Sequence, residues 1–173
     1  MLKRKLPTEI HVLDLFCGSG MRLKMLARRH PKRNFVGVDH FKTGGIEPPP
    51  NLHFVQQDVL EFLRSIKQAG TVHQVNIDYG VHHPGTDKRK ELFAHIAQLL
   101  PPRGSLHVTT YNRQESRPSA ADPERLKREI EAAGLKLFKE APANISTSHS
   151  QFLVENSRKS TRLWFKKPRE TRV

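Results

Sequence analysis

The sequence predicts an α/β fold, a doubly wound and mostly parallel sheet with an antiparallel strand pair at one edge. Two observations support this prediction. Short runs rich in β-branched and aromatic residues alternate along the chain with segments that have the periodicity of helices. The length of 173 residues is enough for one hydrophobic core and too small for two, so we expect a single domain over residues 1–173.

The first half of the chain is expected to contain three strands and two helices. The turn Gly18-Ser19-Gly20 separates the first strand from the first helix. Asp58, with Glu61 three residues later, matches a capping box that opens the second helix. Residues 40–51 hold too many Gly and Pro for a helix. The expected strands span 9–16, 34–39 and 52–56, and the expected helices span 19–29 and 58–68.

The second half continues the alternation and ends differently. A helix opening at Thr86 or Asp87 has its apolar residues on one face, and another begins at Asp122-Pro123 and ends at Gly134. The first five strands should be parallel, because each is followed by a crossover. No helical pattern separates the last two runs, so these should pair antiparallel at one edge. The remaining expected strands span 72–78, 105–111, 135–140 and 161–167.

Composition indicates the kind of partner. Lys and Arg number 30 against 17 acids, giving a net charge of +13, which favours a polyanion such as nucleic acid over a small metabolite. The alternative is a basic domain whose charge serves solubility. Cys17 is the only cysteine, so no intramolecular disulfide can form, and the first thirty residues lack a signal-peptide or membrane-span pattern. We expect a cytoplasmic protein with no membrane partner and with flexible basic ends at 1–8 and 166–173.

Acids and glycines are concentrated where the predicted strands end. In doubly wound sheets, ligands bind beyond the carboxyl ends of the strands, so residues at these positions should meet in one crevice. Asp14 lies inside the first strand and the glycine turn follows it. Asp39, Asp58 and Asp78 lie at or just after the ends of the next three strands.

Asp39 indicates an adenosine-type ligand. It stands nineteen residues after Gly20, a spacing suited to a carboxylate that accepts hydrogen bonds from both ribose hydroxyls. The alternative is an acid that only caps the following loop. A dinucleotide site would need a third glycine where Leu23 stands, and no Gly-Lys-Ser/Thr follows, so a dinucleotide site and a phosphate loop are both disfavoured.

The motifs LDLFCGSG, FVGVD, VQQD and VNIDYG, in this order between Glu9 and Lys139, resemble those of the class I S-adenosylmethionine-dependent methyltransferases. The resemblance implies a Rossmann-like fold and S-adenosyl-L-methionine as the cofactor. It implies that the glycine turn approaches the methionine part of the cofactor, that Asp14 orders that end, and that Asp39 holds the ribose. The implied cofactor-binding residues are Asp14, Gly18, Ser19, Gly20, Asp39, His40, Asp58 and Val59, of which the last two read the adenine.

Two groups within this superfamily are similar to particular segments. RHPKRNFVGVD, KRKELF and GSLHVTT resemble the tRNA (guanine-N7)-methyltransferases. The stretch HPGTDKRKELFAHIAQLLPPRGSLHVTTYN resembles the ribosomal RNA uridine-N3 methyltransferase-like proteins. Both groups act on RNA. The first group's Pro-Asp-Pro-Trp-Pro-Lys signature is replaced by NIDYGVHHPG, which leaves the target base open.

The resemblance assigns the catalytic role to Asp78, which would orient a ring nitrogen toward the methyl group; the alternative is an acid that caps a turn. Tyr79 either stacks on a splayed base or packs under the loop. Lys88, Arg89 and Lys90 follow the fourth strand and are expected to hold phosphates. The loop histidines His82 and His83 lack the partners of a metal site, so no metal is expected, and Cys17 is read as a packing residue.

The sequence therefore predicts an S-adenosylmethionine-dependent methyltransferase that acts on a base nitrogen of tRNA or ribosomal RNA. Two alternatives stay open. One is a methyltransferase for a protein or small molecule, and the other is an inactive RNA-binding protein that keeps the fold. A partner subunit or a homodimer also stays open.

Overall fold

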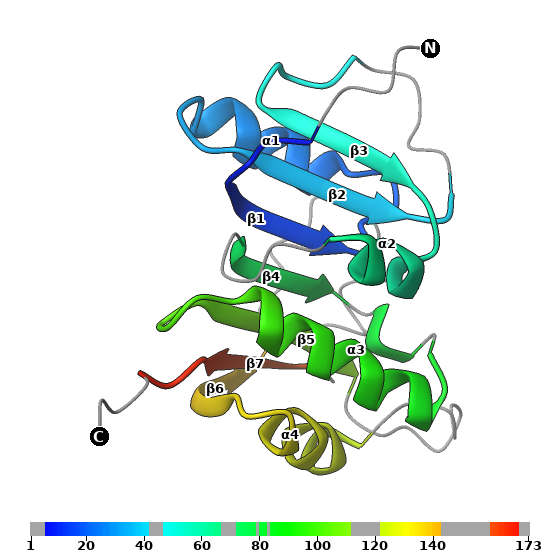
Figure 1. Cartoon of the computed structure of the whole chain (residues 1–173), viewed down its shortest axis with the longest axis vertical. Coiled ribbons are helices and arrows are strands. Elements are labelled where there is room, and N and C mark those ends of the chain that lie inside the picture. Colours follow the sequence, from blue (N-terminus) through cyan, green and yellow to red (C-terminus); the bar gives the residue numbers. More distant parts are fainter. Residues whose placement is uncertain are drawn as a thin grey trace.

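The structure is a computed structural model that describes residues 6–41, 47–66, 72–78, 80–82, 84–111, 122–142 and 160–169. Within these residues a seven-stranded sheet has the order β3-β2-β1-β4-β5-β7-β6 (Figure 1). This is the predicted doubly wound α/β fold. The strands are β1 (Ile10–Leu15), β2 (Phe35–Asp39), β3 (Leu52–Gln56), β4 (Val72–Asp78), β5 (Ser105–Tyr111), β6 (Lys136–Pro142) and β7 (Ser160–Lys166).

The strand directions follow from the connections. Strands β1 to β5 pair in parallel, as expected for strands joined by crossovers. Strand β7 runs antiparallel between β5 and β6, so β6 forms the edge. The predicted antiparallel pairing at one edge is confirmed, and strand order reverses between β1 and β4, where ligands bind in such sheets.

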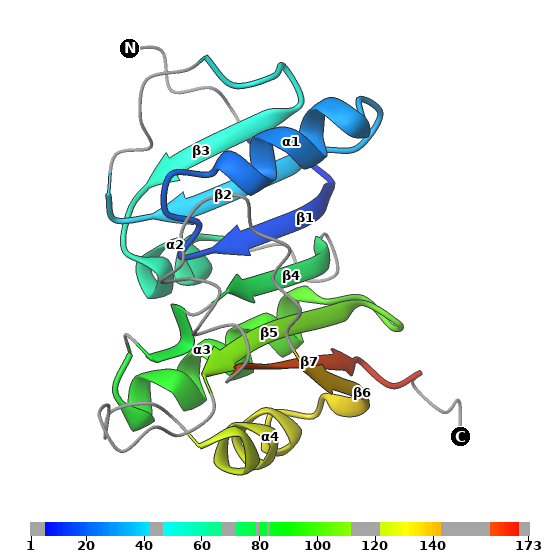
Figure 2. The same cartoon turned by 180° about the vertical axis from the view of Figure 1, so that it is seen from behind.

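The helices divide unequally between the two faces of the sheet. Helix α1 (Met21–Arg29) lies over β1, β2 and β3 on one face, whereas α2 (Val59–Ser65), α3 (Thr86–Leu99) and α4 (Pro123–Ala132) cover the other face (Figures 1 and 2). The larger hydrophobic core lies under these three helices, and a smaller one lies under α1. A single-turn 3₁₀ helix, η1 (Gly80–His82), follows β4.

The helix ends show the expected capping chemistry with small shifts. Asp58 caps α2 by accepting hydrogen bonds from the backbone N–H groups of Leu60 and Glu61, and Asp122 caps α4 in the same way. Helix α1 begins at Met21 and not at residue 19, because Gly20 adopts a φ of +65° that a helical residue cannot have. Helix α2 ends at Ser65, short of the predicted residue 68.

The described residues near the C-terminus are held by the sheet. Lys166 belongs to β7, and the backbone of Lys167 bonds to Gly104 and Arg103. Lys166 thus lies within the strand expected over 161–167, and the predicted flexibility of the ends at 1–8 and 166–173 stays a prediction. In the part of the chain that the structure describes, no helix has the length and apolar character needed to cross a membrane.

Candidate functional site

The glycine turn between β1 and α1 is fastened to the end of β2. The N–H of Gly18 donates to Oδ2 of Asp39 over 2.8 Å, and the N–H of Cys17 donates to the carbonyl of Val38 over 3.2 Å. Oδ1 of Asp39 accepts from the N–H of Phe41 over 3.0 Å. Asp39 is 5% exposed, and an ionised carboxylate has about four acceptor positions, so it retains capacity for ribose hydroxyls.

Two glycines of the turn are required for different reasons. A Cβ on Gly20 would lie 2.3 Å from the Phe54 ring, so no side chain fits there. A Cβ on Gly18 would meet no atom within 4 Å, so this backbone borders open space at the crevice. Both have positive φ, which favours glycine. The absence of a side chain at Gly18 leaves its backbone accessible to a ligand, and this fits the expected cofactor.

Asp14 lies buried on β1 beneath the turn. Burial raises the pKa of its carboxyl group to about 7; the Arg22 guanidinium acts in the opposite direction, and Asp39 adds to the rise. The group therefore titrates near neutral pH. A cationic ligand placed beside it would favour the ionised form, as expected for an acid that orders the charged methionine end of the cofactor.

Asp78 ends β4, and both of its carboxylate oxygens are engaged. Thr109 on β5 donates its hydroxyl to Oδ1 over 2.5 Å, and Arg22 on α1 forms an ion pair with Oδ2. The Asp78 side chain is 29% exposed, so it is open to the crevice. Sequence analysis placed Asp78 at this strand end but did not identify Arg22 or Thr109 as its partners.

Phe16 connects the glycine turn to the segment after β4. Its φ is +58°, a left-handed conformation that is rare for a large residue and is concentrated at functional sites. A Cβ on Gly80 would lie 2.3 Å from Cβ of Phe16, so the Phe16 side chain packs directly on the Gly80 backbone. The turn and η1 are thus locked together beside Asp78.

The other predicted cofactor residues occupy different environments. His40 is exposed, with Nδ1 3.3 Å from Oδ1 of Asp39, and its ring contacts Phe41 at a centroid distance of 3.8 Å. Asp58 is exposed and caps α2. The side chain of Val59 is buried in the core, so only its backbone is available to a ligand. Phe41 is 65% exposed beside this group and was missed by sequence analysis.

Cys17 lies in the turn with a protonated thiol. Burial, followed by the nearby Asp14 and Asp39 carboxylates, raises its pKa to about 12. A thiol of this kind is a poor nucleophile, in agreement with its reading as a packing residue. Among the described residues, no group of three or more His, Cys, Asp or Glu is arranged to hold a metal ion.

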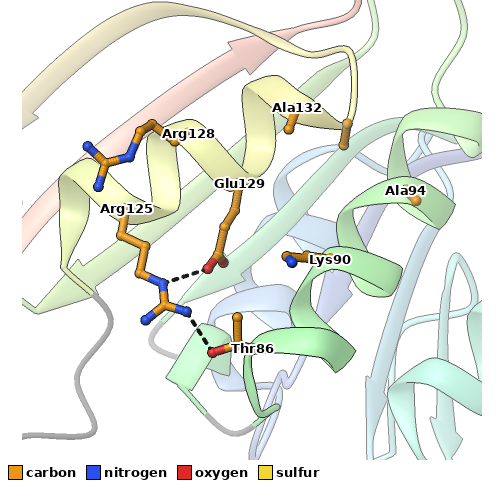
Figure 3. A pocket seen from close by; sticks show the side chains of 8 residues that line it. Thr86, Lys90, Ala94, Arg125, Arg128, Glu129 and Ala132 are labelled. Atoms are coloured by element: carbon orange, nitrogen blue, oxygen red, sulfur yellow. Dashed lines mark hydrogen bonds and ion pairs between the residues drawn. The ribbon is translucent and has the colours of Figure 1, made fainter.

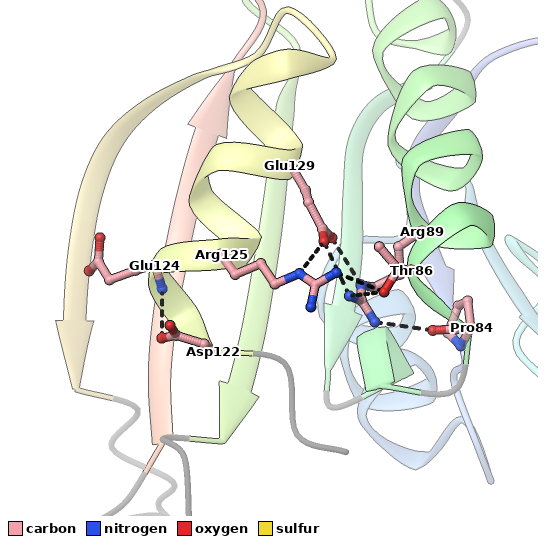
Figure 4. A network of polar contacts seen from close by, with 7 residues as sticks. All are labelled: Pro84, Thr86, Arg89, Asp122, Glu124, Arg125 and Glu129. Carbon is pink, nitrogen blue, oxygen red and sulfur yellow. Dashed lines mark hydrogen bonds and ion pairs between the residues drawn. The ribbon is translucent and has the colours of Figure 1, made fainter. Parts of the chain in front are cut away.

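The structure corrects one member of the predicted phosphate-binding set. Arg89 is 5% exposed, and its Nε donates to Glu129 on α4 over 2.9 Å. Arg125 donates to the same carboxylate over 2.9 Å and to Thr86 over 2.8 Å (Figure 4). Although burial raises the pKa of Glu129, the bonds and charges of both arginines hold it below the usual value. Arg89 therefore joins α3 to α4 and is not available for phosphates.

Lys88 and Lys90 remain exposed on α3. Lys90 lines a groove of about 560 Å³ between α3 and α4, together with Arg125 and Arg128 (Figure 3). Tyr79 and His83 lie outside the described residues, so their predicted roles remain predictions. The spacing in the sequence could not separate Arg89 from its neighbours, because only the packing of α4 shows which helix face is buried.

Sequence comparisons relate part of the chain to small-molecule methyltransferases. No protein-family model matches. The chain is 26% identical over 105 residues to the trans-aconitate 2-methyltransferase of Acidovorax sp. (strain JS42), covering 59% of this chain and 38% of that protein. It is 28% identical over 100 residues to the protein of the same name from Yersinia pestis (strain Pestoides F), covering 56% and 36%. The chain thus matches less than two fifths of each relative.

Solved structures with the same fold cover nearly the whole chain. One is a SAM-dependent methyltransferase from Archaeoglobus fulgidus, with a TM-score of 0.68, 19% identity and coverage of 92% of this chain and 86% of that one. The aminoglycoside resistance methyltransferase NpmB1 has a TM-score of 0.66, 21% identity and coverage of 92% and 88%. The complex of the Haloferax volcanii Trm112 methyltransferase activator with a methyltransferase has a TM-score of 0.67, 15% identity and coverage of 98% and 87%.

The fold and the crevice together define a class. The chain has the Rossmann-like fold of the S-adenosylmethionine-dependent methyltransferases, and the glycine turn, Asp14 and Asp39 form a site that fits this cofactor. The predicted class of fold is confirmed. The relatives named here do not confirm the narrower resemblance to tRNA guanine-N7 or ribosomal uridine-N3 enzymes.

Proposed function

We propose that this chain is an S-adenosylmethionine-dependent methyltransferase that methylates RNA, with a base nitrogen of tRNA or ribosomal RNA as the acceptor. The observation that carries the proposal is the Asp78 carboxylate, which faces the crevice beside the glycine turn and is held by Thr109. The net charge of +13 supports a polyanionic substrate.

The cofactor would be held by the residues of the crevice. The open backbone at Gly18 and the ionised form of Asp14 suit its amino-acid end, Asp39 suits the ribose, and Asp58 with the Val59 backbone suits the adenine. When bound, the cofactor supplies an electrophilic methyl group on a positively charged sulfur. The aromatic pair His40 and Phe41 borders Asp39 and supplies apolar surface beside this site.

Asp78 would orient the acceptor and take up its proton. Its ionised carboxylate is an acceptor only, so a base that carries an N–H can donate to it and direct a ring nitrogen toward the crevice. Thr109 fixes the carboxylate, and Arg22 balances its charge until substrate binds. Tyr79, Lys88 and Lys90 are proposed to stack on the base and contact phosphates. Alignment of this kind contributes much of the rate of a direct displacement.

A second candidate function rests on Arg22. Its side chain is 54% exposed in the crevice, and a guanidinium binds carboxylates well. The relatives that match part of the chain are named as trans-aconitate methyltransferases. A small polyacid held by Arg22 would then be the acceptor, and Asp78 would hold Arg22 in place.

One assay separates these functions. The full chain is incubated with S-adenosylmethionine carrying a labelled methyl group, first with total unmodified RNA and then with trans-aconitate, and the label is located by nucleoside and small-molecule analysis. We expect label on one RNA nucleoside, and loss of it in Asp78→Asn with cofactor binding retained by calorimetry. Label on trans-aconitate alone would establish the second function. RNA and cofactor binding with no transfer in either case would indicate an inactive protein.

A separate experiment tests whether the chain needs a partner subunit for activity. The structural similarity to a methyltransferase in complex with an activator supports the proposal that a further chain assists this one. The same assay in an extract depleted of its own RNA, compared with the pure chain, measures this requirement. An increase in transfer that needs a protease-sensitive component of the extract would support it.

A further inference from the structure

Half of one sheet face has no helix over it in the described part of the chain. Helix α1 covers β1, β2 and β3, whereas β4, β5 and β7 on the same face carry no described helix (Figure 2). The other face of these strands is covered by α3 and α4. Asn76 on β4 and Thr109 on β5 are buried, so the part of this face that a ligand can reach lies on β7 and β6.

Strand register shows which side chains occupy this face. Residues paired across neighbouring strands form rows, and every second residue along a strand returns to the same face. The first row contains the proposed catalytic acid. The three rows are Asp78, Thr109 and Arg162; then Asn76, His107, Trp164 and Lys139; then Gln74, Ser105, Lys166 and Lys136. Five of these residues, on β6 and β7, are exposed or half-buried, and we call them the open sheet face: Lys136, Lys139, Arg162, Trp164 and Lys166.

The open sheet face combines cations with aromatic rings. Nζ of Lys139 lies 5.0 Å from the ring centroid of Trp164, and Cζ of Arg162 lies 5.9 Å from the same centroid. Nζ of Lys166 lies 4.3 Å from the ring of Phe138, a residue at the bulge of β6. Lys139 and Lys166 are exposed, and Trp164 is half-buried. Each ring therefore has a cation beside it and a part open to solvent.

The electrostatics of this face are one-sided. The open sheet face contains four cations and no acid, and Asp78, the acid in the first row, already pairs with Arg22. Arg162 is half-buried, and its Nε is buried, so only the exposed part of its side chain adds positive charge to this surface. Burial, with the charges of Arg22 and Arg162, lowers the pKa of His107 to about 4, in keeping with a strongly positive surrounding.

These features fit single-stranded RNA. A strand offers phosphates to Lys139, Lys166 and Arg162, and a base whose flat surface can stack on Trp164. A duplex would offer only phosphates, because its bases are already stacked. We propose that the open sheet face binds the single-stranded RNA next to the methylated base, with a base on Trp164. This inference rests on the proposed RNA methyltransferase function, and it adds a second RNA contact on β7 and β6 to the substrate site at Asp78.

The chain offers a direct probe of this contact. Trp164 is the only tryptophan, so the intrinsic fluorescence of the full chain reports on this ring alone. Titration with an unstructured twelve-nucleotide RNA should quench the emission as a base stacks on the ring. Anisotropy of the same RNA carrying a dye gives the affinity, and polyglutamate of equal charge serves as a competitor that cannot stack.

A matched pair of variants tests the surface. Lys139→Glu with Lys166→Glu reverses two exposed charges on the open sheet face, and Lys32→Glu with Arg33→Glu makes the same charge change in the turn between α1 and β2. We expect the first variant to bind RNA roughly tenfold more weakly, with a log–log salt slope smaller by about 1.4, the value for two phosphate contacts to a single strand. The control should lose less than about threefold, since only long-range attraction changes.

The outcomes separate this inference from the proposed function. Calorimetric binding of S-adenosylmethionine should be unchanged in both variants. If RNA is bound and methylated but both variants behave alike and Trp164 emission does not change, the surface is wrong and the function stands. If the parent chain binds no RNA, both fail. If polyglutamate displaces RNA at equal charge concentration, an acidic protein is the better partner and the stacking proposal is overturned.

Discussion

At the scale of single residues, the crevice depends on positions where a side chain is not tolerated or is held in an unusual conformation. Gly18 and Gly20 have similar φ values but different surroundings, open space for one and the Phe54 ring for the other. Phe16 shares their left-handed backbone and packs on Gly80. The backbone of this turn is therefore shaped by contacts from β2, β3 and the segment after β4.

Substitution of Gly20 should mainly affect stability, and substitution of Gly18 should mainly affect cofactor binding. We expect Gly20→Ala to lower the free energy of unfolding by about 3 kcal/mol, because backbone strain adds to overlap with the Phe54 ring. Gly18→Ala should lower the free energy of unfolding by only about 1 kcal/mol, from backbone strain. It should nevertheless weaken S-adenosylmethionine binding by about tenfold or more, because the added methyl group would occupy the open space next to the Gly18 backbone.

Urea denaturation and calorimetry measure these two quantities. Gly134→Ala is the matched control, since Gly134 also has a positive φ, at +90°, and open space around it but lies far along the chain after α4. It should show the strain cost without any change in cofactor affinity. Equal cofactor affinity in the Gly18→Ala protein and the parent would argue against the turn as the binding site.

At the scale of elements, α1 and α3 each carry an arginine in an ion pair, and the two arginines have different roles. Helix α1 directs Arg22 toward Asp78 in the crevice, whereas α3 uses Arg89 to hold α4 through Glu129. The side chains of Arg89 and Glu129 are 7% and 8% exposed, so water screens this pair poorly. The same residue type thus has a structural role on one helix and a site role on the other.

The contact between α3 and α4 predicts a large effect of one substitution. Glu129→Leu should lower the free energy of unfolding by about 3–5 kcal/mol, because Arg89 is left buried without a counter-charge. The double variant Arg89→Met with Glu129→Leu should recover to within about 1 kcal/mol of the parent. The exposed Glu124→Gln on the same helix should change it by less than about 0.5 kcal/mol.

Chemical denaturation of these proteins, followed by RNA titration of the double variant, completes the test. The double variant should bind RNA as the parent does, because Arg89 contacts protein and not phosphate. A loss of RNA affinity in the stable double variant would restore Arg89 to the substrate site.

At the scale of the whole molecule, two buried titratable groups oppose each other. Asp14 keeps its proton in the folded state up to about pH 7, whereas its unfolded value is 3.8, so folding binds a proton and stability falls as the pH rises through this window. His107 stays neutral in the folded state down to about pH 4 against 6.5 when unfolded, so stability is lost as the pH falls through this window.

These opposing slopes should partly cancel in the parent between about pH 4.5 and 6.5. In Asp14→Asn, the free energy of unfolding should rise with pH, because only His107 still titrates in this window. In His107→Gln, the free energy of unfolding should fall with pH, by at most about 1.4 kcal/mol per pH unit. The slope from His107 should be the smaller, since this side chain is partly open to solvent. Denaturant titrations at three pH values measure all four proteins, including the double variant. Parallel curves for both single variants would contradict the assigned pKa values.

The sequence by itself determined the order and type of the elements. Hydrophobic runs, the capping acids Asp58 and Asp122, and the breaks at Gly and Pro act locally, so their effect can be read without knowing what packs on them. The acids Asp14, Asp39 and Asp78 could be assigned to one crevice for a related reason, since carboxyl ends of parallel strands share an edge.

Only the tertiary structure decided what each charge does. Arg89 and Lys90 are neighbours in sequence, yet one is buried against Glu129 and the other is exposed, because α4 packs on a single face of α3. Arg22 meets Asp78, and Trp164 meets Lys139, across distances in sequence that no local pattern spans. These contacts depend on strand order and register, which arise from the packing of the whole chain and not from any segment alone.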